Sequence, residues 1–376
     1  MINKKILEKT FLELLAINSP SKKEKKVHGY ILKYLAGIAD KIKTDDAGRG
    51  FGGDCGNIVA KFKGGNSFAP MIILLSHMDT VTDTANLKIV KKNGIIKSDG
   101  TTILGADDKA GVAIMLALAH ELNKPAVRRN LGDVELVFTP AEEIGLFGVT
   151  HLDFSLISGT MAYVLDSNEP VGHITTSSPS AANITAKIHG KAAHAGAEPE
   201  KGINAISIAS KAISKMRLGR LDHETTANIG IINGGKATNI VPDLVTAEGE
   251  SRSFSKQKLE KQIQHMEKCF VDAAKSAGGR ADVAIRHSFE TYLISDKEPV
   301  LTVAKNAAKR IGVKFKATRS GGGSDANVLN RNGISSVVVG LGYKGPHTGH
   351  EEISVKDLAL GAKYMMAILE EGARQK

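Results

Sequence analysis

Residues Met71–Thr80 read MIILLSHMDT, a short apolar run followed by a histidine, His77, and an aspartate, Asp79. Three further short runs are similarly apolar: Val134–Phe138 (VELVF), Met161–Leu165 (MAYVL) and Ser336–Val339 (SVVV). None has the clean polar alternation of a half-exposed strand, so each is expected to be buried on both faces. Helical patterns separate the runs, and Ala110–Leu122 is the strongest of them. This alternation predicts a three-layer αβα domain with a mixed, mostly parallel sheet.

The middle of the chain has a different pattern, which begins after the turn-rich stretch Thr175–Ala181 (TTSSPSA). Its elements are predicted in the order strand, helix, strand, strand, helix, strand, at Asn183–Ile188, Gly202–Arg217, Ala227–Ile232, Leu244–Glu250, Lys256–Ala277 and Asp282–Glu290. This order is typical of a ferredoxin-like α+β unit. We therefore expect one domain made of residues 1–179 and 293–376, with a smaller domain, residues 180–292, inserted into it.

Composition excludes several classes of protein. The chain has 376 residues, 42% hydrophobic and 24% charged, with 50 basic and 40 acidic side chains and hence a net charge of +10. The lysines are scattered, Trp is absent and no basic run is interleaved with aromatics, which argues against nucleic-acid binding. No segment approaches the roughly 20 apolar residues that a membrane span requires. The charged, helical N-terminus does not resemble a secretory signal, so the protein is expected in the cytoplasm.

Potential metal ligands follow the four buried runs: His77, the pair Glu142 and Glu143, Asp166, and His347. Asp107, in the loop GADDKAG before the long predicted helix, adds another carboxylate. In open α/β sheets, ligands bind outside the carboxyl ends of the strands. The two cysteines, Cys55 and Cys269, form no CxxC motif, so any metal site is expected to use His, Asp and Glu.

The number and type of these residues predict two metal ions. A single catalytic zinc takes about three protein ligands, and more are available here. Nitrogen and oxygen ligands suit Zn²⁺, with Mn²⁺ or Co²⁺ as alternatives. Asp79 is placed to accept the second N–H of His77. Neighbouring side chains point in different directions, so one glutamate of the pair 142 and 143 can bind metal while the other serves as general base.

Eight segments together resemble the two-metal aminoacylase, carboxypeptidase and tripeptidase superfamily, and most closely its peptidase T-like branch. They are SHMDTV, GADDKAG, TPAEEIGLFG, VLDSNEP, KAAHAG, TNIVPD, SGGGSD and PHTGHEE, which span essentially the whole chain. The resemblance implies that His77 and Asp166 bind one metal, that Glu143 and His347 bind the other, and that Asp107 bridges them. It also implies that Glu142 is the general base and that the inserted domain is a lid that often mediates dimerisation.

The resemblance extends to residues of the inserted domain and to a glycine turn that follows it in the chain. His194 in KAAHAG is similar to a lid histidine that polarises the scissile carbonyl, often from the partner subunit; alternatively, it only caps its own loop. Asn239 and Arg252 resemble residues that hydrogen-bond the substrate and clamp a carboxylate, although Arg252 could be a plain surface residue. Gly321–Gly323 resembles a glycine turn, in which the N–H groups of Gly322 and Gly323 could hold an anionic substrate end.

Two features depart from the branch pattern. Ala141 stands where peptidase T tends to carry an acid, and the residues around His194 differ, which argues against strict tripeptide specificity. His350 competes with His347 as a ligand, but the family spacing to Glu351 favours His347.

The expected function is hydrolysis of an amide bond in a small peptide by a homodimeric, tripeptide aminopeptidase-like metallopeptidase. A metal-bridging hydroxide would attack, and Glu142 would carry the proton. The alternatives are an N-acyl amino acid deacylase, a carboxypeptidase, or a catalytically silent binding relative.

Overall fold

The computed structural model describes residues 2–375, which form two compact units. The main unit comprises the chain up to Ser177, Leu293–Ser320 and the chain from Ser324 onward. The inserted unit comprises Ser178–Tyr292 together with Gly321–Gly323.

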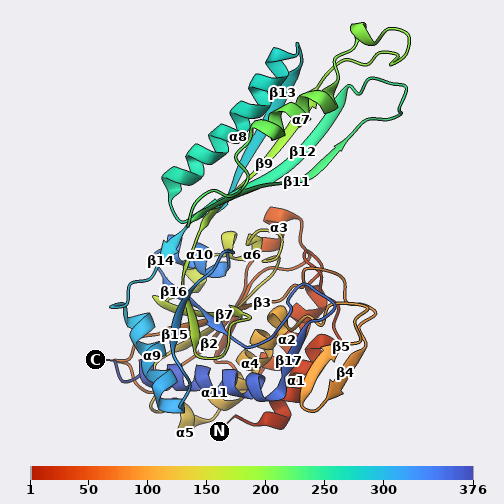
Figure 1. The fold of residues 1–376 in the computed structure, drawn as a ribbon. Coiled ribbons are helices and arrows are strands. Elements are labelled where there is room, and N and C mark those ends of the chain that lie inside the picture. Colours follow the sequence, from red (N-terminus) through yellow and green to blue (C-terminus); the bar gives the residue numbers. More distant parts are fainter. Residues whose placement is uncertain (1, 376) are drawn as a thin grey trace. The chain divides into compact units, whose positions relative to one another are not determined.

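The main unit is built around a nine-stranded sheet in the order β1-β2-β6-β3-β7-β16-β8-β14, with β15 paired to β8 (Figure 1). The central strands β6, β3, β7 and β16 run parallel. Strand β2 pairs antiparallel with β1 and β6, and β8 pairs antiparallel with β16 but parallel with β15. The four buried runs of the sequence are these four central strands. The strands are β1 Lys41–Thr44, β2 Ile58–Phe62, β3 Ile72–His77, β6 Val134–Thr139, β7 Met161–Ser167, β8 His173–Ser178, β14 Tyr292–Leu293, β15 Lys316–Arg319 and β16 Ser335–Gly340.

Helices pack against this sheet, so the α/β class is confirmed. Every side chain of α4 except that of His120 is buried, because its Ala- and Leu-rich sequence contacts β3, β7, α1 and α11. Helices α9 and α10 both contact β7 and β16. The helices are α1 Lys4–Leu15, α2 Lys25–Leu35, α3 Ala47–Phe51, α4 Ala106–Leu122, α5 Pro125–Arg128, α6 Phe147–Thr150, α9 Pro299–Ile311, α10 Asp325–Arg331 and α11 Val355–Gly372, with a 3₁₀ turn at Phe154–Leu156.

A small three-stranded sheet, also in the main unit, has the order β17-β5-β4. The hairpin of β4 Ile89–Lys92 and β5 Ile95–Ser98 pairs with β17 Glu352–Ser354. Because β17 follows the loop that carries His347, this pairing anchors one end of that loop.

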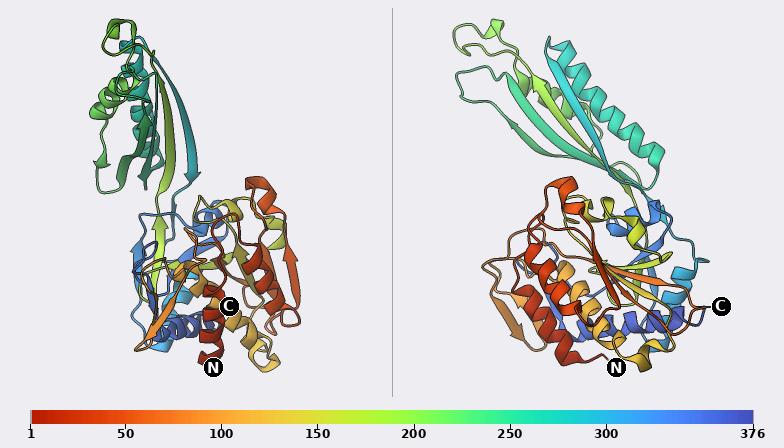
Figure 2. Two further views of the ribbon diagram at one scale, coloured as in Figure 1. Left: turned by 90° about the vertical axis from the view of Figure 1, so that its right-hand side faces the viewer. Right: turned by 180° about the vertical axis from the view of Figure 1, so that it is seen from behind.

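The inserted unit has the order β9-α7-β10-β11-β12-α8-β13 along the chain and an antiparallel sheet in the order β10-β11-β12-β9-β13. Helices α7 and α8 cover one face of the sheet (Figure 2). Apolar residues at alternate positions of β9, such as Ile184 and Ile188, pack with Ile263 and Phe270 of α8. The elements are β9 Ser180–His189, α7 Ala205–Lys215, β10 Gly219–Arg220, β11 Thr225–Gly234, β12 Leu244–Ser253, α8 Lys256–Ser276 and β13 Arg280–Phe289, with a 3₁₀ turn at Pro199–Lys201.

The stretch Thr175–Ala181, expected to be a turn, is instead almost entirely strand. Strands β8 and β9 leave only Pro179 between them, because β8 pairs with β15 and β16 while β9 pairs with β12 and β13. The Ser and Thr side chains form side-chain bonds there; for example, the Ser178 hydroxyl donates to the carbonyl oxygen of Gly322 at 2.7 Å. Sheet pairing therefore overrides the local turn preference of this composition.

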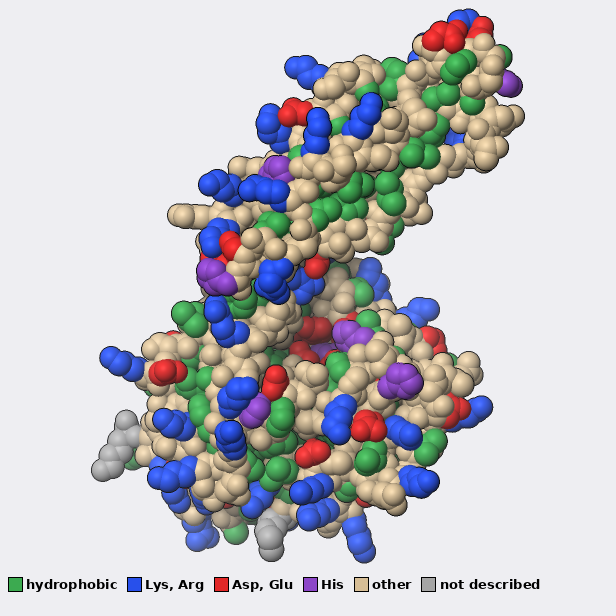
Figure 3. All heavy atoms as spheres, in the orientation of Figure 1, with side chains coloured by type: hydrophobic (Ala, Val, Ile, Leu, Met, Phe, Trp, Pro, Cys, Tyr) green, Lys and Arg blue, Asp and Glu red, His purple; other side chains and the backbone are tan. Residues whose placement is uncertain are grey.

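Surface charge and hydropathy agree with the composition. Lys and Arg side chains are spread over the visible face of each unit rather than gathered in one stripe (Figure 3). Within residues 2–375, no helix is both long enough and apolar enough to cross a membrane.

Candidate metal centre and active site

Five potential ligands lie at or after the ends of four neighbouring strands, or at the start of α4. His77 is the last residue of β3, and Asp166 lies near the end of β7. Glu143 follows β6, His347 follows β16, and Asp107 lies in the first turn of α4. Since β6, β3, β7 and β16 are parallel, their carboxyl ends share one edge of the sheet.

The structure brings these side chains together in two groups that share one residue. In the first group, His77 Nε2 lies 3.3 Å from Asp107 Oδ1 and 3.8 Å from Asp166 Oδ1. In the second, His347 Nε2 lies 3.3 Å from Asp107 Oδ2 and 3.2 Å from Glu143 Oε2. Within each group the potential ligand atoms all lie within 4.8 Å of one another. Asp107 thus offers one carboxylate oxygen to each group.

The electrostatics of the two groups fit divalent cations. Glu143 Oε1 is buried and has no hydrogen-bond partner. Burial, together with the neighbouring carboxylates of Glu142 and Asp107, raises the pKa of Asp166 well above its usual value. Buried carboxylates crowded in this way are destabilised unless a cation neutralises them. The donor set, two imidazoles and three carboxylates, suits Zn²⁺, Mn²⁺ or Co²⁺.

Asp79 organises both sides of the site. Its carboxylate lies 3.3 Å from His77 Nδ1 and accepts a 2.6 Å bond from the Ser21 hydroxyl. It also accepts the backbone N–H groups of Glu142 and Glu143, at 3.0 Å and 3.2 Å. Burial alone would raise the pKa of Asp79, but the bond to His77 and these donors lower it overall. One ionised carboxylate therefore orients a potential ligand and fixes the backbone of the glutamate pair.

Glu142 belongs to neither ligand group, although it is adjacent to Glu143. Burial, followed by the charges of Asp325, Glu143 and Asp79, raises the pKa of Glu142 well above its usual value. Asp325, at the start of α10, accepts a 2.6 Å bond from the Thr139 hydroxyl. The carboxyl of Glu142 is thus not one of the potential metal ligands, although the charge of the adjacent Glu143 acts on it.

Glu351 supports the loop of Asp107, a role that the sequence did not indicate. Its two carboxylate oxygens accept the backbone N–H groups of Asp107 at 2.9 Å and Gly105 at 2.7 Å. Its place in GHEE, four residues after His347, favoured His347 as the ligand but gave no indication of this contact. His350, the competing histidine, is exposed and lies in neither ligand group.

The structure places His194 in an exposed loop of the inserted unit. His194 Nδ1 accepts the backbone N–H groups of Gly196 at 3.2 Å and Ala197 at 3.0 Å. In the neutral ring the proton therefore lies on Nε2, which makes that atom a hydrogen-bond donor. Asn239 lies beside this loop, because its carbonyl oxygen accepts the N–H of Ala195 at 2.9 Å.

Arg252, expected to clamp a substrate carboxylate, is paired with a carboxylate of its own unit. Its guanidinium donates to both oxygens of Glu250, at 3.0 Å and 2.9 Å, and to the carbonyl oxygen of Gly321 at 3.1 Å. Gly322 accepts the bond from Ser178, and a side chain at Gly323 would collide with the ring of Phe289 at 2.5 Å. The glycine turn therefore packs closely against the rest of the inserted unit.

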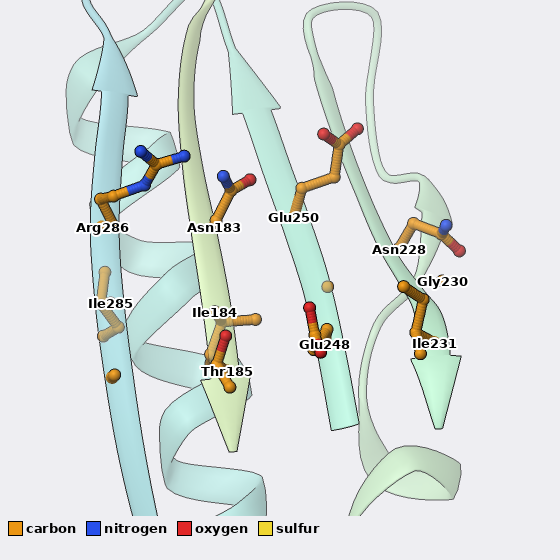
Figure 4. A pocket seen from close by; sticks show the side chains of 12 residues that line it. Asn183, Ile184, Thr185, Asn228, Gly230, Ile231, Glu248, Glu250, Ile285 and Arg286 are labelled. Atoms are coloured by element: carbon orange, nitrogen blue, oxygen red, sulfur yellow. The ribbon is translucent and has the colours of Figure 1, made fainter. Parts of the chain in front are cut away.

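The open face of the inserted sheet carries a shallow hollow of about 560 Å³. Arg286, Asn183, Glu250 and Asn228 form a row across four strands there, and Ile231 lies beside the row (Figure 4). None of the residues proposed from the sequence lines this hollow.

Comparison with known proteins identifies the class. The chain belongs to peptidase family M20/M25/M40, whose sequence pattern matches residues 73–371. A tripeptidase from Staphylococcus aureus subsp. aureus Mu50 is 39% identical, with a TM-score of 0.94 and full coverage of both chains. Aminopeptidase PepT from Bacillus cereus ATCC 10987 is 41% identical, with a TM-score of 0.89 and 99% coverage of both chains.

Peptidase T of Clostridium novyi is 30% identical over 295 residues, which is 77% of this chain and 71% of that protein. The chain is therefore a peptide-bond hydrolase of the peptidase T-like branch.

Proposed function

We propose that this chain is a dinuclear metal-dependent peptidase that cleaves small peptides. The observation that carries this proposal is the position of Asp107, whose two carboxylate oxygens lie at 3.3 Å from His77 Nε2 and from His347 Nε2. His77 and Asp166 would hold one ion, Glu143 and His347 the other, and Asp107 both. Of the metals that suit these ligands, Zn²⁺ is our first choice, with Co²⁺ or Mn²⁺ as alternatives.

We assign the catalytic chemistry to the two ions, to Glu142 and to Asp79. When bound, the two ions supply Lewis-acid polarisation of the scissile carbonyl and activation of the attacking water. Glu142 takes a proton from that water and delivers it to the leaving amine nitrogen. Its carboxyl is available for this transfer because Glu142 lies in neither ligand group. Asp79 keeps His77 oriented and fixes the backbone N–H groups of both glutamates.

We propose an aminopeptidase-like action on tripeptides. The support is the similarity to proteins described as a tripeptidase and an aminopeptidase. The test is the turnover of tripeptides, dipeptides and N-acetyl amino acids by zinc-loaded protein. Release of the amino-terminal residue from a tripeptide is the expected result. Preferential release of acetate would indicate a deacylase, and release of the carboxyl-terminal residue a carboxypeptidase. No turnover by metal-loaded protein would favour a binding relative.

We further propose that the inserted unit is a lid through which two chains form a homodimer. The exposed edges of its sheet and the half-exposed side chains of Ile231 and Ile232 support this proposal. His194 would donate its Nε2 proton to the substrate carbonyl, and Asn239 and the amides of Gly322 and Gly323 would hold the substrate. Arg252 would release the carboxylate of Glu250 and bind a substrate carboxylate in its place.

Subunit mixing tests the role of His194. Glu142→Gln and His194→Ala protomers, each inactive alone, should regain part of the activity when mixed if the histidine acts across the dimer. No recovery despite proven subunit exchange would leave action within one chain. A strictly monomeric protein would contradict the dimer proposal.

We place the reaction in the cytoplasm. The two cysteines of the chain, Cys55 and Cys269, are free thiols, as is usual in a reducing compartment. Subcellular fractionation with activity assays tests this location.

A further inference from the structure

A second group of potential ligands lies outside the two groups described above. Glu24 immediately precedes α2, while Asp54 and Cys55 lie in the loop between α3 and β2. One potential ligand atom from each of the three lies within 4.8 Å of the others. The group combines a buried carboxylate, an exposed carboxylate and a partly buried thiol.

Two buried atoms without partners accompany this group. Glu24 Oε1 accepts the N–H groups of Lys22 and Ala141, both at 2.9 Å, but Glu24 Oε2 is buried and has no hydrogen-bond partner. The whole residue is 0% exposed. His28 lies one helical turn later, on the same side of α2, and its Nε2 is also buried without a partner. Such unpaired polar atoms are destabilising, and each is a good metal ligand.

The charges around the group favour a cation. Burial raises the pKa of the Cys55 thiol, and the carboxylates of Glu24, Asp54, Asp79 and Asp45 raise it further. Burial and the charge of Asp79 likewise raise the pKa of Glu24, to about 7. A divalent cation would reverse both effects, because it stabilises a thiolate and a carboxylate together.

We propose that Glu24, Asp54 and Cys55 form an additional divalent-cation site, with His28 available as the fourth ligand. Tetrahedral zinc with bonds of about 2.0 to 2.3 Å needs ligand atoms roughly 3.3 to 3.8 Å apart. The potential ligand atoms of Glu24, Asp54 and Cys55 lie within 4.8 Å of one another and would draw closer around the ion. A sulfur, oxygen and nitrogen set suits Zn²⁺ or Co²⁺. This proposal departs from the expectation that any metal site would use only His, Asp and Glu.

The site would brace the chain beside the catalytic glutamates. Its ion would join the loop of Asp54 and Cys55 to the start of α2. Glu24 continues this connection to the backbone N–H of Ala141, the residue before Glu142. The role is structural, since none of these ligands belongs to either group of the active site.

Cobalt spectroscopy of the full chain separates this site from the active site, whose potential ligands include no sulfur. Co²⁺-loaded protein should show a near-ultraviolet thiolate-to-cobalt charge-transfer band. Cys55→Ser should abolish the band and bind one equivalent less metal, whereas Cys269→Ser, the matched control, should retain both. Absence of the band in the unmodified chain, its survival in Cys55→Ser, or its loss in Cys269→Ser would overturn the proposal.

A measurement on the unmodified chain covers the case in which Cys55→Ser does not fold. Zn²⁺ should slow the alkylation of Cys55 at least tenfold, as measured by mass spectrometry of the peptide that contains it. An unchanged alkylation rate in zinc-saturated protein would overturn the proposal. Because neither readout uses turnover, failure of this site would leave the peptidase proposal standing.

Discussion

The substitution Glu142→Gln tests the division of labour between the adjacent glutamates. Glutamine has nearly the same shape but cannot accept the proton, so only the proton transfer is removed. A general base typically contributes about 10²- to 10⁴-fold, which corresponds to about 2.7 to 5.4 kcal/mol in the barrier. We therefore expect kcat for a tripeptide to fall by about that factor.

Metal content and stability should not fall with it. Glu142 belongs to neither ligand group, and its backbone bond to Asp79, at 3.0 Å, does not involve the side chain. Because burial disfavours the ionised carboxyl, a neutral amide should leave the melting temperature unchanged or higher.

The matched control is Glu143→Gln, which alters an oxygen 3.2 Å from His347 Nε2 and should release one equivalent of metal. Turnover by product chromatography and metal content by elemental analysis are the assays. Loss of metal from Glu142→Gln, with metal retained by Glu143→Gln, would refute the reasoning.

Three further predictions concern the supports of the structure. Asp79→Asn removes the charge beside His77 Nδ1, so metal affinity should fall about 10- to 100-fold in chelator competition; unchanged affinity would contradict this role. In metal-free protein, folded Glu24 keeps its proton up to a pKa of about 7, against an ordinary value of 4.5. Stability should therefore fall by about 3 kcal/mol as the pH rises between these values. The free energy of unfolding of Glu24→Gln, measured in urea, should lack that fall. The same pH profile in Glu24→Gln and in the unmodified protein would contradict this prediction. Phe270→Ala, at a fully buried position, should destabilise the inserted unit by about 3 to 5 kcal/mol, whereas Val271→Ala, 42% exposed, should have little effect; equal denaturation midpoints would disprove this assignment of the core.

The central strands could be predicted from the sequence because each is buried on both faces. Continuous apolar runs such as Ile72–Leu75 of β3 remain recognisable without any partner strand. The edge strands Lys41–Thr44 and Ile89–Lys92 are short and mostly exposed, so they carry no such pattern. Ser and Thr in Thr175–Ala181 favour a turn locally, and only pairing with distant strands makes the segment extended.

The potential ligands were recognisable for a similar reason, because each lies next to an element whose type the sequence indicates: Asp107 at the start of a helix, the others near or after the end of a strand. The distances between these ligands depend on the sheet order, which brings Asp107 next to His347 although the two are remote in sequence. The role of Glu351 and the cluster of Glu24 with Cys55 depend on contacts between segments remote in sequence. No local pattern signals such contacts, so they emerge only from the folded chain.

The most direct test of the central claim is anomalous diffraction from crystals of the zinc-loaded protein. At the carboxyl ends of the central strands we expect two peaks about 3.5 to 4 Å apart, with one oxygen of Asp107 on each; the additional site of Glu24, Asp54 and Cys55 would give a separate peak. His77 and Asp166 should bind the first ion, and Glu143 and His347 the second. A single ion in this region, or His350 in place of His347, would contradict the account.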